Sequence, residues 1–172
     1  NAPSIQLFLE YVVRSQTAEI FYENVLMAFH FYGMPVLVEN NKLRLLYYLK
    51  NRGYRAFSIN RPDKHKNEVE KAEKEIGGIP SSTAVISIHA EALESYIEMN
   101  VGYDYSGQYR DPDTPGKMYF NQTLLDWANY DITKRTKFDA TVSSGFAVMA
   151  TNKYVVKPQN NRKEISVKFA RY

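Results

Sequence analysis

The fold that this sequence predicts is decided by residues 35–41, which read PVLVENN. The apolar run at 36–38 is short and uninterrupted, which is typical of a strand buried on both faces in the middle of a sheet. Glu39 follows this run, and Asn41 opens a helical pattern. We therefore expect Glu39 at the carboxyl end of a central strand, where open sheets with helical crossovers bind their ligands.

The segments around this run predict alternating strands and helices. Residues 5–14 are rich in β-branched, aromatic and aliphatic side chains and predict a strand, and residues 18–31 predict a helix. A second helix is expected between Asn41 and Gly53, followed by a strand over residues 54–59. This order requires parallel crossovers with helices packed on the faces of a sheet, so the predicted class is α/β.

The second half of the chain continues with helical patterns. Residues 83–99, 121–129 and 139–152 each predict a helix, and residues 164–169 predict one more strand. The segment 63–75 is almost entirely charged and is typical of a solvated helix or a lid.

Length and composition set broad bounds on the protein. The 172 residues are expected to form one domain, 1–172, with a core of its own. The net charge of +3 permits a nucleic-acid partner without requiring one. The sequence has no cysteine, which excludes disulfides and thiolate metal sites. No apolar run reaches the roughly 20 residues of a membrane span. The chain starts at Asn1 with a predicted strand only four residues later, which indicates a piece of a longer protein.

Two acidic residues are the candidates for a metal site. Glu39 ends the predicted central strand, and Asp139 begins a helix rich in alanine, serine and glycine. Each has an ordinary alternative role, because an acidic residue beside a helix N-terminus complements the helix dipole or caps the helix. Small residues would let the Asp139 helix approach the sheet closely, and two carboxylates brought together can bind a divalent cation through oxygen.

Other kinds of site find little support. His30 and His89 lie in helical patterns and are expected to be packed or on the surface, and no zinc-type spacing is present. The sequence has no nucleophile elbow of the Gly-x-Ser-x-Gly type and no P-loop.

Basic and aromatic residues give weaker indications of nucleic-acid binding. A cluster of cations beside the acidic residues would follow a phosphate backbone. The candidates for DNA contacts are Arg110, Lys117, Lys134, Arg135 and Lys137. Tyrosines within residues 103–120 are interpreted either as stacking platforms for bases or as part of an amphipathic hairpin.

Two parts of the sequence resemble the nuclease domain of the large terminase subunit of tailed bacteriophages. The first runs from Arg14 to Asp63 and includes VLVENN, LLYYLKNRGY and INRPDK, and the second is RTKFDAT at 135–141. The resemblance covers most of the chain. It implies an RNase H-like mixed sheet flanked by helices, with two Mg²⁺ or Mn²⁺ ions held by clustered carboxylates. It also implies an endonuclease that cuts concatemeric viral DNA during genome packaging by two-metal phosphodiester hydrolysis.

The resemblance also assigns roles to individual residues. Glu39 and Asp139 match two of the family's catalytic metal ligands, and Asn41 would orient one of them. The family's first acidic residue lies on an upstream β-hairpin that is absent here, so the first strands and the ATPase domain are expected to be missing. The implied partners are double-stranded DNA, the ATPase domain, the portal protein and the small terminase subunit. The implied location is the host bacterial cytoplasm and, transiently, the procapsid portal, away from any membrane.

Two other functions stay open at this point. The chain is also compatible with another RNase H-like nuclease, such as a junction resolvase. It is equally compatible with a DNA-binding or motor-docking module that has no catalytic activity.

Overall fold

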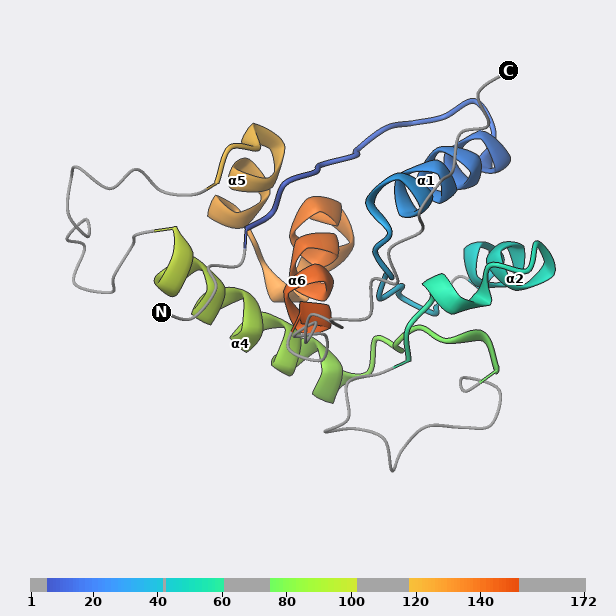
Figure 1. Cartoon of the computed structure of the whole chain (residues 1–172). Coiled ribbons are helices and arrows are strands. Elements are labelled where there is room, and N and C mark those ends of the chain that lie inside the picture. Colours follow the sequence, from blue (N-terminus) through green and yellow to red (C-terminus); the bar gives the residue numbers. More distant parts are fainter. Residues whose placement is uncertain (1–5, 42, 61–74, 102–117, 152–172) are drawn as a thin grey trace, which may run out of the picture.

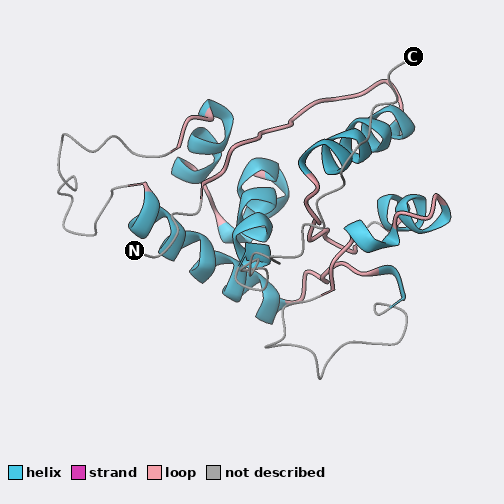
Figure 2. Cartoon of the chain, viewed as in Figure 1, coloured by secondary structure: helices cyan, strands magenta, loops and turns pink. Residues whose placement is uncertain are grey.

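A computed structural model describes residues 6–41, 43–60, 75–101 and 118–151, and these are largely helical (Figures 1 and 2). The helices are α1 (Ala18–Tyr32), α2 (Arg44–Asn51), α4 (Thr83–Asn100), α5 (Asn121–Ala128) and α6 (Asp139–Thr151). Two 3₁₀ helices join them, η1 (Arg55–Phe57) and η3 (Ile132–Lys137).

The predicted RNase H-like mixed sheet is wrong for the part of the chain that the structure describes, because this part contains no strand. Residues 36–40, 58–60 and 78–79 meet only through isolated parallel bridges. Two features keep the backbone pairing between these three segments short. The 3₁₀ helix η1 ends directly before Ser58, and Gly77 and Gly78 have φ of 83° and 85°, outside the range of a β-strand.

The strand predicted over residues 5–14 is also wrong for its described part. Residues 6–14 are extended and run from beside α5 to the start of α1 (Figure 1), but they have no backbone partner among the described residues. Side chains hold this segment instead. Tyr96 Oη accepts from the backbone N–H of Leu7 at 3.3 Å, and Glu10 Oε1 accepts from the backbone N–H of Thr123 at 3.0 Å.

The predicted helices are confirmed with shifts of one to three residues at their ends. Thr17 caps α1, whose C-terminal Gly33 has φ of 63°, and Ser82 caps α4 through the backbone N–H of Val85. The residues that α4 buries are Val85, His89, Leu93 and Tyr96.

The core lies where α4 and α6 pack against the bridged segments. Its buried side chains are Leu37, Ile59, Ile79, Val85, Phe146 and Met149. The small residues of α6 do permit a close approach, but to α4 and not to a sheet. A Cβ added at Gly145 would lie 2.1 Å from Nε2 of His89, which leaves no room for any side chain at this position.

None of the helices in the described ranges is long and apolar enough to cross a membrane. The predictions for residues 63–74, 103–117 and 164–169, with Arg110 and Lys117 among them, lie outside the described residues.

Candidate functional site

The backbone around Glu39 is fixed by its bridge to Ile79. The N–H of Asn40 donates to the carbonyl oxygen of Ile79 at 2.9 Å, and the N–H of Ile79 donates to that of Val38 at 2.9 Å. Ser81 follows two residues after Ile79, directly before the N-cap of α4. The side chains of Glu39 and Ser81 therefore meet beside the N-terminus of α4.

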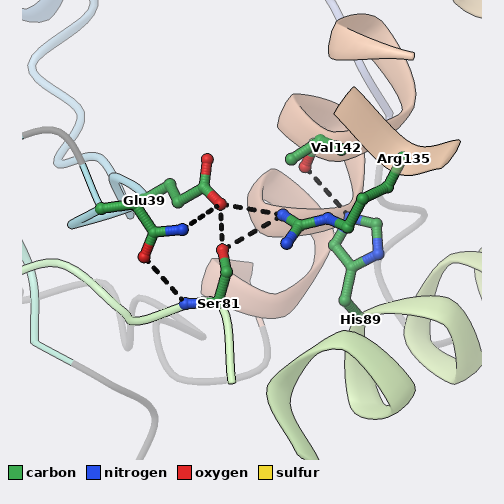
Figure 3. A network of polar contacts seen from close by, with 6 residues as sticks. Glu39, Ser81, His89, Arg135 and Val142 are labelled. Atoms are coloured by element: carbon green, nitrogen blue, oxygen red, sulfur yellow. Dashed lines mark hydrogen bonds and ion pairs between the residues drawn. The ribbon is translucent and has the colours of Figure 1, made fainter. Parts of the chain in front are cut away.

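Four side chains form a connected polar network here, which we call the Glu39 cluster: Glu39, Asn41, Ser81 and Arg135 (Figure 3). Glu39 Oε1 accepts hydrogen bonds from Arg135 Nη2 at 2.8 Å, from Asn41 Nδ2 at 3.3 Å and from Ser81 Oγ. Arg135 Nη2 also lies 3.1 Å from Ser81 Oγ, and the N–H of Ser81 donates to Asn41 Oδ1 at 3.3 Å. Three donors, one of them cationic, thus converge on one carboxylate oxygen.

The ion pair at the centre of the Glu39 cluster is partly buried. The side chain of Arg135 is 18% exposed and that of Glu39 is 34% exposed, so water still reaches one side of the pair. Glu39 Oε2, in contrast to Oε1, has no hydrogen bond from any described residue. The cluster therefore holds the carboxylate in one orientation through its first oxygen alone.

His89 lies below Arg135 on the side away from Glu39 (Figure 3) and is 3% exposed. Its Nε2 lies 3.0 Å from the carbonyl oxygen of Val142, which can only accept, so this nitrogen carries the proton. Burial lowers the pKa of His89, the hydrogen bond to Val142 opposes this shift, and the nearby charge of Arg135 lowers the pKa further. The neutral ring is packed against Gly145 and Phe146, which is one of the two positions, packed or on the surface, that the sequence left open.

Asp139 is the first residue of α6 and is exposed. The N–H of Ala140 is bonded to Asp126 Oδ2 at 3.0 Å, so a residue of α5 caps this helix end. Among the described residues no hydrogen bond or ion pair joins the side chain of Asp139 to the Glu39 cluster, although Asp139 is only four positions beyond Arg135. The structure thus places Asp139 near the Glu39 cluster along the chain and outside its hydrogen bonds.

The remaining predicted site residues fall in different places. Asn41 does not cap α2, whose N-cap is Leu43, and it bonds Glu39 and Ser81 instead. Lys134 pairs with Asp131 at 3.0 Å, and Lys137 is exposed. Arg135, predicted to contact DNA, is the ion-pair partner of Glu39.

Sequence reasoning missed Ser81 as a member of the cluster and the pairing of Arg135 with Glu39. These residues are separated from Glu39 by 42 and 96 positions. A local sequence pattern cannot indicate contacts between residues that are so far apart along the chain. The only local signal is the Ser81-Ser82 pair before a helical pattern, and such a pair is typical of a helix cap and of nothing more.

The chemistry of the Glu39 cluster partly fits a magnesium or manganese ion. Carboxylate and amide oxygens are the ligands that these cations prefer, and Glu39 Oε2 is open. Across the described ranges, however, no three histidine, aspartate or glutamate side chains lie close enough together to hold a metal. Glu39 is the one carboxylate of the cluster, so within the described residues the cluster does not by itself complete a metal site.

Comparisons of this chain with protein-family models, with curated proteins and with solved structures found no match.

Proposed function

We propose that this chain is a metal-dependent DNA endonuclease and belongs to the large terminase subunit of a tailed bacteriophage. The contact between Arg135 Nη2 and Glu39 Oε1 is the observation that carries the proposal. It joins the VLVENN segment to the RTKFDAT segment, the two parts on which the resemblance to terminases rests. The proposal needs these segments to form one site, and the contact is consistent with that.

The charge around the Glu39 cluster suits a DNA substrate. Lys134, Arg135 and Lys137 all belong to η3, the short helix that leads into α6. Arg135 lies beside Glu39, Lys137 is exposed on the same short helix, and Lys134 is paired with Asp131. Cations on a helix that contacts such a carboxylate would neutralise the phosphates on either side of a cut.

The reaction would add water across a phosphodiester bond. A bond forms between the water oxygen and phosphorus, and the bond from phosphorus to the 3′ oxygen breaks, which leaves a 5′-phosphate and a 3′-hydroxyl. A bound divalent cation would supply Lewis acidity and lower the pKa of a coordinated water. Glu39 would hold the cation through Oε2 while Asn41 and Ser81 keep the carboxylate oriented. Asp139, exposed at the start of α6, would provide a second carboxylate.

In this role the chain would cut concatemeric viral DNA in the host bacterial cytoplasm, transiently at the procapsid portal. Its partners would be double-stranded DNA, the ATPase domain, the portal protein and the small terminase subunit.

A second candidate is a DNA-binding or motor-docking module without catalytic activity. It is favoured by the ion pair itself, since Arg135 already compensates the charge of Glu39. Such a module would bind duplex DNA in a salt-dependent manner with a chelator present, and added metal would change nothing.

The test is nicking of supercoiled plasmid by the full-length protein with MnCl₂ or with EDTA. We expect Mn²⁺-dependent cleavage that falls at least about a hundredfold in Glu39→Gln and Asp139→Asn, because electrostatic groups of this kind contribute on that scale. Glu91→Gln is the matched control, since Glu91 is an exposed acid on α4 away from the cluster. Cleavage by Glu39→Gln at the wild-type rate would refute the assignment.

Two further results would redirect the proposal. Salt-dependent DNA binding without cleavage in any metal would favour the non-catalytic module. Cleavage of four-way junctions in strong preference to linear duplex would favour a junction resolvase.

A further inference from the structure

A groove of about 400 Å³ lies between α4 and the segment that runs from α5 to η3. Apolar and acidic side chains line it together, among them Leu93, Ile97, Trp127, Ile132, Glu94 and Glu98. The groove shares no residue with the Glu39 cluster, and its volume is within the range of sites that bind small ligands. It is therefore a second candidate binding site on the described part of the chain.

The two helices that border the groove carry acidic residues and no lysine or arginine. Their acidic residues are Glu91, Glu94, Glu98 and Asp126. The side chain of Glu98 is partly exposed, and no hydrogen bond or ion pair joins it to another residue in the described ranges. Because binding partners present complementary charge, this groove favours a cationic ligand.

The aromatic residues of the groove suit a cation that has an apolar stem. Trp127 Nε1 donates to Ser144 Oγ at 3.0 Å, which fixes the position of the indole. A cation over an indole face is attracted to it, and an aliphatic stem packs well on apolar side chains. Tyr130 also lines the groove, and its hydroxyl is buried without a hydrogen-bond partner among the described residues. Buried hydroxyls normally have such a partner, so this one is consistent with a ligand that donates N–H.

We propose that this groove binds an arginine side chain from a basic peptide segment of a partner protein. The aliphatic stem would lie on Ile97, and the guanidinium would reach the carboxylate of Glu98 beside Trp127. Arginine fits better than lysine, because its planar guanidinium stacks on aromatic rings and binds a carboxylate through two hydrogen bonds.

The basic residues that follow α5 in the described ranges favour a source outside the chain. Lys134 is paired with Asp131 at 3.0 Å, and Arg135 is paired with Glu39 at 2.8 Å. Both cations nearest in sequence to the groove are therefore already used within the fold. DNA does not suit the groove, because the glutamates would repel its phosphates.

The experiment measures binding of a fluorescein-labelled peptide to the full-length protein by fluorescence anisotropy. The peptide consists of glycine, serine and several arginines, and we expect a dissociation constant below about 1 mM. The same peptide with neutral citrulline in place of each arginine should bind at least about tenfold more weakly, because it loses both the charge-assisted hydrogen bonds and the attraction to the indole.

Two matched variants of α4 locate the peptide. Glu98→Gln should weaken binding about fivefold, as expected for the loss of a partly exposed ion pair. Glu91→Gln removes the same charge from the same helix outside the groove, and it should weaken binding by less than about twofold because solvent screens it. Circular dichroism checks that both variants remain folded.

The other outcomes overturn the proposal in distinct ways. Equal binding of the arginine and citrulline peptides would exclude a cationic ligand. An equal loss of affinity in Glu91→Gln and Glu98→Gln would assign binding to the general charge of α4 and not to the groove. Absence of binding at about 1 mM protein would exclude the site. Peptide affinity that falls as the protein concentration rises would indicate that a second copy of the chain occupies the groove in place of a partner.

Discussion

Replacing Gly145 by alanine tests the contact that holds α6 against α4. An ideal Cβ at this position would lie 2.1 Å from Nε2, 2.5 Å from Cδ2 and 2.7 Å from Cε1 of His89. Heavy atoms in van der Waals contact are about 3.5 Å apart, so the overlap exceeds about 1 Å at the closest atom. His89 is 3% exposed and is bonded to the carbonyl oxygen of Val142, so its ring cannot move aside freely.

The expected change in the free energy of unfolding combines three contributions. Overpacking of this kind destabilises by about 1–3 kcal/mol. Loss of the hydrogen bond between His89 and Val142 adds about 1 kcal/mol, and the better helix propensity of alanine returns about 1 kcal/mol. We therefore expect Gly145→Ala to destabilise the chain by about 2 kcal/mol, although the same substitution in an open helix would stabilise it.

Urea unfolding, followed by circular dichroism and by the fluorescence of Trp127, measures this change. Trp127 is the single tryptophan, and its Nε1 donates to Ser144 Oγ on α6 at 3.0 Å, so it reports directly on this helix. Gly145→Ala in a His89→Ala background is the matched control. There the ring is gone, and the added methyl group should be neutral or stabilising by up to about 1 kcal/mol.

The two measurements together decide whether the reasoning holds. If Gly145→Ala stabilises the chain with His89 in place, the close packing of α6 on α4 is wrong. If it destabilises equally in both backgrounds, the cause is not the His89 ring.

Three further predictions concern substitutions at single residues. The pKa of His89 is lowered mainly by burial, so the folded protein favours the neutral ring. The stability that comes from this neutral ring is complete above about pH 6.5, the ordinary pKa of histidine, and is lost as the pH falls below that value. The urea midpoint should therefore fall less between about pH 7.5 and pH 5.5 in His89→Gln than in the wild type. Glu10 caps the first turn of α5, so Glu10→Ala should destabilise the chain by about 1–2 kcal/mol and speed proteolysis within residues 6–14. Glu10→Gln keeps an acceptor oxygen, so its stability and its rate of proteolysis should be closer to those of the wild type. Gly78→Ala should cost about 2–3 kcal/mol in thermal unfolding, since its φ is 85° and its Cβ would lie 2.8 Å from the carbonyl oxygen of Val38. Gly53→Ala, with φ of 81° and open space around it, should show only the backbone strain of about 1 kcal/mol.

Local signals in the sequence predicted the helices well. Thr17, Gly33 and Ser82 mark helix ends through their own backbone and side-chain chemistry, and the structure places helix ends at these residues. The face that α4 buries was harder to predict, because it depends on what packs against it. His89 lies on the buried face since Gly145 leaves space for its ring, and this complementarity is invisible in either segment alone.

The strand predictions were wrong for a related reason. Apolar, β-branched runs at 6–14 and 36–39 favour extended backbone, and both are extended in the structure. A strand also requires a partner of matching length, and that is a property of the whole fold. Residues 6–14 have no such partner among the described residues, and the partners of 36–39 are cut short by η1 and by Gly77 and Gly78.

The candidate site was predicted in part. Glu39 stood out because it follows an apolar run and precedes a helix, and Asn41 because it lies two residues further on. The pairing of Glu39 with Arg135 was not predictable, since an arginine in a basic run is ordinarily solvated. The carboxylate and the cation meet only because α6 and the start of α4 are packed together.

The most direct test of the account is a crystal of the chain soaked in MnCl₂, with anomalous diffraction used to locate the metal. The account predicts a peak about 2.1 Å from a carboxylate oxygen of Glu39. A well-ordered Glu39 still bound to Arg135, with no peak beside it at saturating Mn²⁺, would contradict the central claim that this carboxylate is a metal ligand.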